Sequence, residues 1–181
     1  MPGHGDLTAV ERFVAVDPTA SIDISLATNT SELETVTTVP VAAWYESTAL
    51  DLNLSLTSND NSVLTVDSNR TDRSVTVQAD TVADIAADLG IERIDFLKIE
   101  AEGAEPEVLE GALAGQIPIR KIPVDCAPER DGEPPRDEIE NTLVETGYDV
   151  RSGWGGRTVY AKENNSLAPR MTSWLTNRYG L

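Results

Sequence analysis

The sequence contains few of the side chains that bind metals or attack substrates. Its 181 residues include one cysteine, Cys126, and one histidine, His4. A single cysteine excludes an intramolecular disulfide framework and a zinc site made of several cysteines. With its only histidine at position 4, the chain also offers no histidine-based catalytic triad and no histidine-rich metal cluster. We therefore predict no metal ligands of these types.

Long apolar runs are missing as well. No stretch approaches the roughly 20 apolar residues that a membrane-spanning helix needs. The first ten residues, MPGHGDLTAV, lack the charged and then apolar layout of a secretory signal. We expect a cytoplasmic protein without a membrane span.

Basic residues are scarce, and lysine above all. The chain has 14 basic and 31 acidic residues, a formal charge of −17, and only three of the cations are lysines. So negative a surface repels nucleic acid and anionic lipid, and we predict that the protein binds no nucleic acid. The acidity can serve solubility alone or adaptation to high salt, where ions screen the self-repulsion. We favour a halophilic source, because acid excess and lysine scarcity occur together.

The length and the 40% hydrophobic content fit one globular domain over residues 1–181. Residues 1–11 are expected to be disordered or a remnant, and residues 165–181 to form a tail. Apolar and β-branched runs predict strands, and capped periodic segments predict helices. The predicted strands cover residues 12–17, 36–44, 49–57, 63–66, 75–77, 94–99, 117–126, 148–151 and 158–161. The predicted helices cover residues 22–34, 81–89, 106–113, 137–146 and 169–179.

Strands and helices alternate through the second half of the chain, and the last two strands flank a glycine-rich turn. This order predicts an α/β fold with a mostly parallel sheet and a C-terminal antiparallel hairpin. Ligands of such sheets bind beyond the carboxyl ends of the strands. Acidic residues at those ends are therefore the candidates for function.

Asp17 ends the first predicted strand and precedes Pro18. A carboxylate there can hydrogen-bond the hydroxyls of a nucleoside ribose, and a structural turn acid is an equally good interpretation. The second candidate is the run from Lys98 to Glu105, which holds Glu100 and Glu102. Its carboxylates can bind Mg²⁺ through oxygen, or simply complement the dipole of the following helix.

More polar residues lie at and just after the end of the strand predicted over residues 117–126. Asp125, Glu129, Arg130 and Asp131 can line an acceptor site or form a solvated loop. Cys126 is better explained as a small core residue than as a nucleophile. The three tryptophans are better explained as core or rim residues than as stacking platforms.

The segment IDFLKIEAEGAEPEVLEGA, residues 94–112, resembles the FkbM-type methyltransferases, whose members typically read I-D-hydrophobic-hydrophobic-K-I-D-V-E-G-A-E-x-x-V-L-x-G-A. VQADTVADIAADLG before it is similar to the helix that precedes this motif in the family. FVAVDP resembles the strand that ends in Glu-Pro, and residues 39–44 resemble the stretch before the family's β-hairpin region. The resemblance covers about residues 12–161.

The resemblance implies a Rossmann-like class I fold that uses S-adenosylmethionine to methylate a hydroxyl of a sugar, a glycan or another hydroxylated small molecule. It implies that Asp17 holds the cofactor ribose and that Ala42 lies near the adenine. Lys98, Glu100 and Glu102 would form the catalytic, acceptor-facing side. Mg²⁺ can assist, and a homo-oligomer is compatible with the family.

Two departures from the family pattern affect this expectation. Glu100 stands where members usually have Asp, which moves the carboxylate by about one methylene. The usual first strand and its glycine-rich turn are absent. Before residue 12 the glycines lie only in Gly3-His4-Gly5-Asp6, and no apolar strand precedes them. We expect this shortening to impair cofactor binding and activity. The alternatives are a non-catalytic binding or assembly protein with a degenerate methyltransferase fold, and a metal- or nucleotide-binding module.

Overall fold

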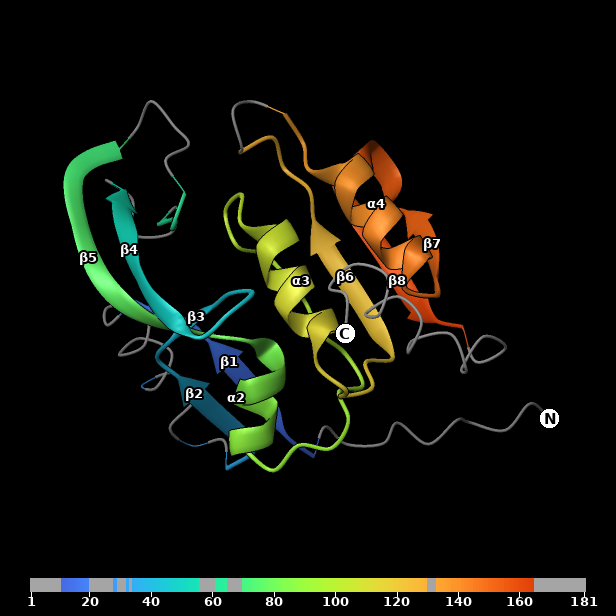
Figure 1. Cartoon of the computed structure of the whole chain (residues 1–181), viewed down its shortest axis with the longest axis horizontal. Helices are drawn as coiled ribbons and strands as arrows, with labels where there is room; N and C mark the ends of the chain where they lie inside the picture. Colours follow the sequence, from blue (N-terminus) through green and yellow to red (C-terminus); the bar gives the residue numbers. More distant parts are fainter. Residues whose placement is uncertain are drawn as a thin grey trace, which may run out of the picture.

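The computed structural model of the 181-residue chain describes residues 11–19, 28, 32, 34–55, 61–64, 70–129 and 133–164 (Figure 1). Its strands are β1 (Phe13–Val16), β2 (Val36–Val39), β3 (Ala42–Ala43), β4 (Thr48–Ser55), β5 (Arg70–Asp80), β6 (Lys121–Asp125), β7 (Tyr148–Ser152) and β8 (Thr158–Glu163). Its helices are α2 (Val82–Asp88), α3 (Glu105–Ala114), α4 (Arg136–Glu145) and the short 3-10 helix η1 (Trp154–Gly156). The helix expected over residues 169–179 and most of that over 22–34 lie outside the described residues.

The strands form three sheets in place of the one that we expected. β1 and β2 pair in parallel, β3-β5-β4 form a mixed sheet, and β6-β8-β7 form an antiparallel sheet. The α/β class and the C-terminal antiparallel hairpin are therefore confirmed. A single, mostly parallel sheet is not what the described residues contain.

Residues 94–99 explain part of this difference. We expected a strand, and the segment does run parallel to β6, with bridges from Ile94 to Ile119 and from Ile99 to Val124. Between these bridges the Leu97 N–H donates to Lys121, 2.9 Å away, but the reciprocal donor would be residue 123. That residue is Pro123, which has no N–H, so the ladder is interrupted there.

Proline also divides the strand that we expected over residues 36–44. β2 ends at Val39, one residue before Pro40, and β3 begins at Ala42. The two halves then pair with different neighbours, β2 with β1 and β3 with β5. β5 is much longer than the predicted 75–77, because its 11 residues pair along β4 in an antiparallel ladder.

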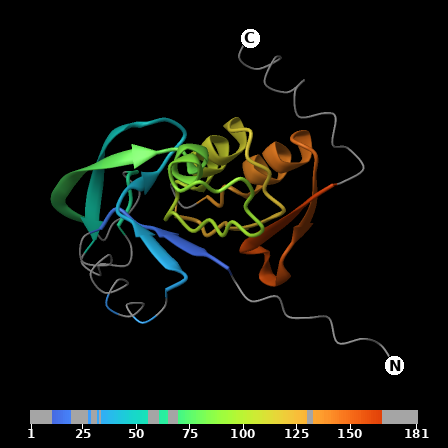
Figure 2. The same cartoon turned by 90° about the horizontal axis from the view of Figure 1, so that it is seen from below.

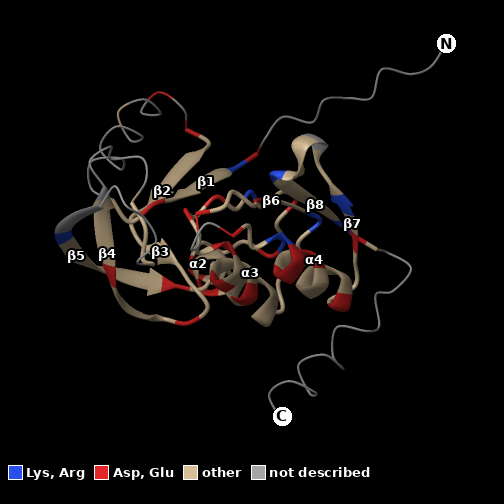
Figure 3. Cartoon of the chain, turned by 90° about the horizontal axis from the view of Figure 1, so that it is seen from above, with Lys and Arg blue, Asp and Glu red and all other residues tan. Residues whose placement is uncertain are grey.

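The helices α2, α3 and α4 lie on the same side of the row formed by the strands (Figures 1 and 3). The main core fills the space between α3, α4 and the β6-β8-β7 sheet. Leu109, Ile122, Ile139, Leu143 and Val159 are 0% exposed within it. No helix in the described ranges is long and apolar enough to cross a membrane.

The two ends of the row differ in character. β4 and β5, teal and green in Figure 2, form a long hairpin at one end, and β7 and β8 lie at the other. Acidic residues gather on the helices, whereas Lys and Arg mark β6, β7 and β8 (Figure 3). The segment 94–99, α3 and β6 lie between the two ends, and the candidate functional residues follow from these elements.

Candidate functional site

An acidic turn, residues 100–104, joins the segment 94–99 to α3. Glu102 adopts a positive φ of 49° and Gly103 one of 94°, which reverse the chain sharply. α3 then begins at Glu105, followed by Pro106, whose fixed φ suits the first turn of a helix. The backbone conformation therefore concentrates carboxylates at the end of a strand-like segment and at a helix N-terminus.

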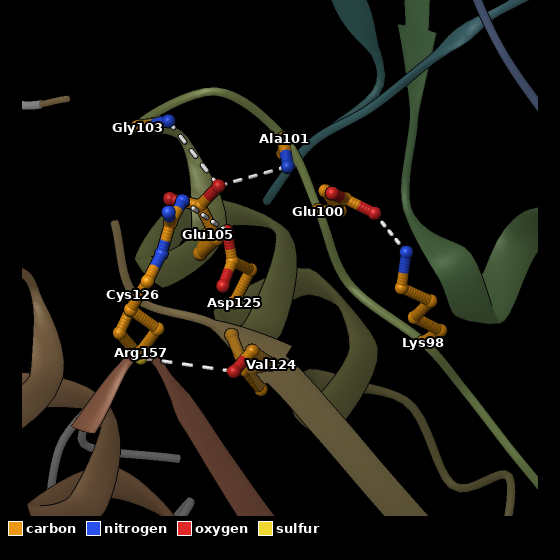
Figure 4. Close-up of polar contacts among 9 residues, drawn as sticks. All are labelled: Lys98, Glu100, Ala101, Gly103, Glu105, Val124, Asp125, Cys126 and Arg157. Carbon is orange, nitrogen blue, oxygen red and sulfur yellow. Dashed lines mark hydrogen bonds and ion pairs between the residues drawn. The ribbon is translucent and has the colours of Figure 1, made fainter. Parts of the chain in front are cut away.

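The buried side chain of Glu105 stabilises this turn through hydrogen bonds to its backbone. Its Oε1 accepts the N–H of Ala101 at 2.8 Å and that of Gly103 at 3.2 Å (Figure 4). The residue is only 1% exposed, and burial raises the pKa of its carboxyl. Among the described residues, its other oxygen, Oε2, has no hydrogen-bond partner. Glu105 thus combines a structural role with an unsatisfied buried acceptor.

The end of β6 brings more carboxylates to the same place. The N–H of Asp125 donates to the carbonyl of Ile99 at 2.9 Å, which aligns the two strand ends. Asp125 lies 3.8 Å from the guanidinium of Arg157 and beside Glu105 (Figure 4). Its negative charge also contributes to the raised pKa of Glu105.

Glu129 completes what we call the acid cluster: Glu102, Glu105, Asp125 and Glu129. Burial raises the pKa of Glu129 to about 7, and the negative charges of the other three add to the effect. Its carboxyl also hydrogen-bonds that of Glu102. With a pKa of about 7, the carboxyl of Glu129 is partly protonated at neutral pH and can accept or release a proton there.

The three residues predicted as catalytic do not stay together. Lys98 and Glu100 form an ion pair with each other, and their side chains are 61% and 51% exposed. Glu102 instead hydrogen-bonds Glu129 in the acid cluster. The acids of the turn are thus divided: Glu100 lies in an exposed ion pair, and Glu102 lies beside the partly buried Glu129.

The two residues predicted to hold the cofactor lie on separate elements. Asp17 follows β1, and its Oδ1 accepts both the N–H and the Oγ1 hydroxyl of Thr19 at 2.8 Å. This is the geometry of a turn acid, and it uses one of the two carboxylate oxygens. Ala42 is 4% exposed and packs with Ala104 in the second core cluster, so β3 lies against the acidic turn.

The remaining candidates have structural roles. Cys126 is 1% exposed, and burial raises the pKa of its thiol to about 11, as expected of a core residue rather than a nucleophile. Trp44 is 8% exposed and belongs to the second core cluster, which confirms the core interpretation for that residue. Within the described ranges, no group of three or more His, Cys, Asp or Glu residues is arranged to hold a metal ion.

A family model for the methyltransferase FkbM domain matches residues 6–172. The chain belongs to the FkbM methyltransferase family. None of the curated proteins matches it. Among solved structures, the methyltransferase FkbM from Methylobacillus flagellatus KT is similar, with a TM-score of 0.48 and 15% identity. The match covers 84% of this chain and 36% of that one, so this FkbM chain spans about a third of its neighbour's length.

The FkbM family is a family of methyltransferases, and it generally uses S-adenosylmethionine. Ser62 and Arg157 were not predicted from the sequence, and Glu105 was predicted only as the end of the acidic run. Ser62 is 4% exposed and donates its hydroxyl to the carbonyl of Glu102 at 2.8 Å, which ties the turn to the β4–β5 hairpin. No sequence pattern distinguishes Ser62 from the other polar loop residues around it, and Glu105 is one acid among several.

Proposed function

We propose that this chain transfers a methyl group from S-adenosylmethionine to a hydroxyl oxygen of a sugar, a glycan or another hydroxylated small molecule. The family match over residues 6–172 supports the reaction class. The acid cluster at the ends of the segment 94–99 and β6 supports its position, because ligands of α/β folds bind beyond the carboxyl ends of the strands.

S-adenosylmethionine supplies an electrophilic methyl group when it is bound. On the protein side, Asp17 would accept hydrogen bonds from the ribose hydroxyls, and Ala42 would lie near the adenine. The bonds from Thr19 fit this role, because they fix one oxygen of Asp17 and thereby orient the other. A carboxylate that is already oriented loses less entropy when it binds a ligand.

Lys98, Glu100 and Glu102 would form the acceptor side, and we add Glu129 to them as the better base. Glu100 is engaged in an exposed ion pair with the Lys98 ammonium. Glu129 has a pKa of about 7, where a carboxylate accepts a proton most effectively at neutral pH. It would take the hydroxyl proton as the oxygen attacks the methyl carbon.

Calorimetric titration with S-adenosylmethionine in molar KCl tests the proposal. We expect saturable binding by the parent chain. Asp17→Ala should weaken binding by about 1.5–3 kcal/mol, the range for a lost hydrogen bond to a charged group. Asp88→Ala, which removes an exposed acid from α2, is the matched control and should bind as the parent does.

A chain that is folded, binds no S-adenosylmethionine and produces no S-adenosylhomocysteine with any hydroxylated acceptor would refute the proposal. Equal affinity of Asp17→Ala and Asp88→Ala would leave Asp17 as a turn residue only. In that case the cofactor ribose would have another partner.

A further inference from the structure

The acidic turn contains a residue with a side chain in the left-handed backbone region. Glu102 has a φ of 49°, a conformation that is unfavourable for any residue with a Cβ. Such a conformation persists only where the surrounding structure enforces it, and it occurs preferentially at functional sites. The contacts that hold the Glu102 backbone therefore bear on what the turn does.

Hydrogen bonds hold this turn from two sides. On one side, Oε1 of Glu105 accepts the N–H groups of Ala101 and Gly103, which flank Glu102. On the other side, the hydroxyl of Ser62 donates to the carbonyl of Glu102 at 2.8 Å. Glu105 is a local partner, whereas Ser62 lies 40 positions away in the sequence. Ser62 therefore connects the left-handed residue to a different part of the chain.

The hydroxyl of Ser62 is itself held in one orientation. Its oxygen accepts the N–H of Leu64 at 3.1 Å, so its single proton is free to point at Glu102. The Ser62 and Asn53 backbones exchange hydrogen bonds of 2.8 and 3.2 Å, and the Asn53 side chain donates to the Ser62 carbonyl at 3.2 Å. Ser62 is only 4% exposed, so bulk water has little access to its bonds. The position of the hydroxyl is thus set by β4.

Apolar contacts support the same geometry without the hydroxyl. Val63 and Leu64, next to Ser62, pack against the second core cluster, and so does Ala101 of the acidic turn. Ala104, at the end of the turn, belongs to that cluster. Loss of the Ser62 hydroxyl should therefore leave the packing in place and affect mainly the backbone of Glu102.

We infer that Ser62 is a positioning residue for methyl transfer: its hydroxyl holds the Glu102 backbone in the left-handed region and thereby sets the direction of the Glu102 side chain. This inference rests on the proposed function, which places Glu102 on the acceptor side and Asp17 at the cofactor. Without the hydroxyl, we expect the Glu102 backbone to relax toward negative φ and to turn the carboxylate away. A displacement of about 1 Å can slow an aligned reaction on the order of 100-fold.

Ser62→Ala removes the hydroxyl and little else. The acceptor probes are the methyl glycosides of glucose, galactose and mannose, assayed one by one for formation of S-adenosylhomocysteine. We expect Ser62→Ala to lower kcat by about tenfold or more, because alignment is lost. Its Kd for S-adenosylmethionine, measured by calorimetry, should equal that of the parent, since Asp17 lies on another element. Ser62→Thr keeps a hydroxyl on the same carbon and should recover most of the rate.

Ser152→Ala is the matched control. It removes a hydroxyl that donates to Glu140 on α4 at 2.7 Å, away from the acidic turn, and should keep the parent rate. Hydrogen exchange gives a second measurement that needs no substrate. The amides of Ala101 and Gly103 should exchange faster in Ser62→Ala than in the parent, and should be unchanged in Ser152→Ala.

A folded Ser62→Ala chain with the parent kcat, an equal loss in Ser152→Ala, or a Ser62→Thr chain as slow as Ser62→Ala would overturn the inference. So would a Ser62→Ala chain that does not fold, because Ser62 would then stabilise the whole domain and not the turn. A failure of the proposed function is distinguishable, since the parent itself then binds no S-adenosylmethionine and methylates no probe. Unchanged exchange of the Ala101 and Gly103 amides in Ser62→Ala would even then refute the hold of Ser62 on the turn.

Discussion

Replacement of Gly111 by alanine gives a strong test of how α3 is placed. Gly111 lies inside α3, and a Cβ there would overlap the carbonyl oxygen of Trp44. It would also lie 2.9 Å from the Trp44 carbonyl carbon and 3.0 Å from Tyr45 Cα. In an exposed helix the same substitution stabilises by roughly 0.5–1 kcal/mol, because glycine has the larger conformational entropy to lose.

The expected sign is the opposite here. Carbon atoms in contact lie about 3.5–4.0 Å apart, and the overlap with the Trp44 oxygen is greater still, so α3 must retreat by roughly 1 Å or more from the backbone that follows β3. Overpacking of this kind costs about 1–3 kcal/mol, which exceeds the gain in helix propensity. We therefore expect Gly111→Ala to lose on the order of 1–2 kcal/mol of unfolding free energy. The retreat also displaces Glu105 at the start of α3 and loosens the acidic turn.

Urea unfolding in molar KCl measures the loss. Gly90→Ala is the control: Gly90 has a φ of +66° and nothing within 4 Å of its Cβ position, so only backbone strain of about 1–2 kcal/mol applies. Only Gly111→Ala should also weaken binding at the acid cluster. If Gly111→Ala is as stable as the parent and binds as well, the close approach of α3 to Trp44 is incorrect.

Three further outcomes are expected. Because the chain carries a charge of −17, its melting midpoint should rise by many degrees between low and molar KCl, and a flat midpoint would argue against adaptation to salt. Glu129 keeps its proton to about pH 7 in the folded chain, against a usual pKa of 4.5, so the unfolded chain releases that proton first as pH rises. Stability should therefore fall between pH 4.5 and 7. The full shift corresponds to about 3 kcal/mol of unfolding free energy, and solvent screening reduces it to on the order of 1 kcal/mol. The urea unfolding midpoint of Glu129→Gln should depend on pH less strongly than that of the parent, and an equally strong dependence would contradict this. Thr81→Ala removes the hydroxyl that accepts the Asp84 N–H at 2.9 Å at the start of α2, and should cost about 1 kcal/mol in a thermal melt.

Elements with local signals were predicted well from the sequence. A capped helix was expected over residues 81–89, and in the structure Thr81 is the N-cap of α2, with Gly90 after the helix in the left-handed region. The helix expected over residues 137–146 is α4, and the terminal hairpin is β7 and β8. In each case a cap, a glycine or a turn of adjacent residues sets the boundary of the element, so a short window of sequence is enough to predict it.

Features that depend on a distant partner were predicted less well. The interruption of the segment 94–99 comes from Pro123, which lies on the neighbouring strand and not in the segment itself. For the candidate site, the sequence indicated the acidic run and the polar end of β6, but not that Glu102 meets Glu129. Burial decides which acid of a run changes its pKa, and burial depends on how α3 packs.

The hydrogen bond from Ser62 to the carbonyl of Glu102 places the acid cluster under the influence of a separate part of the chain. Ser62 also pairs with Asn53 of β4, so hydrogen bonds connect the long β4–β5 hairpin to the acidic turn. Loops that join strands accept insertions and deletions more readily than the strands do. Changes of length near Ser62 can therefore reposition Glu102 while every acidic residue is retained. In evolutionary terms, the hairpin is a place where a change of length can alter the geometry of the acidic turn without a change in its residues.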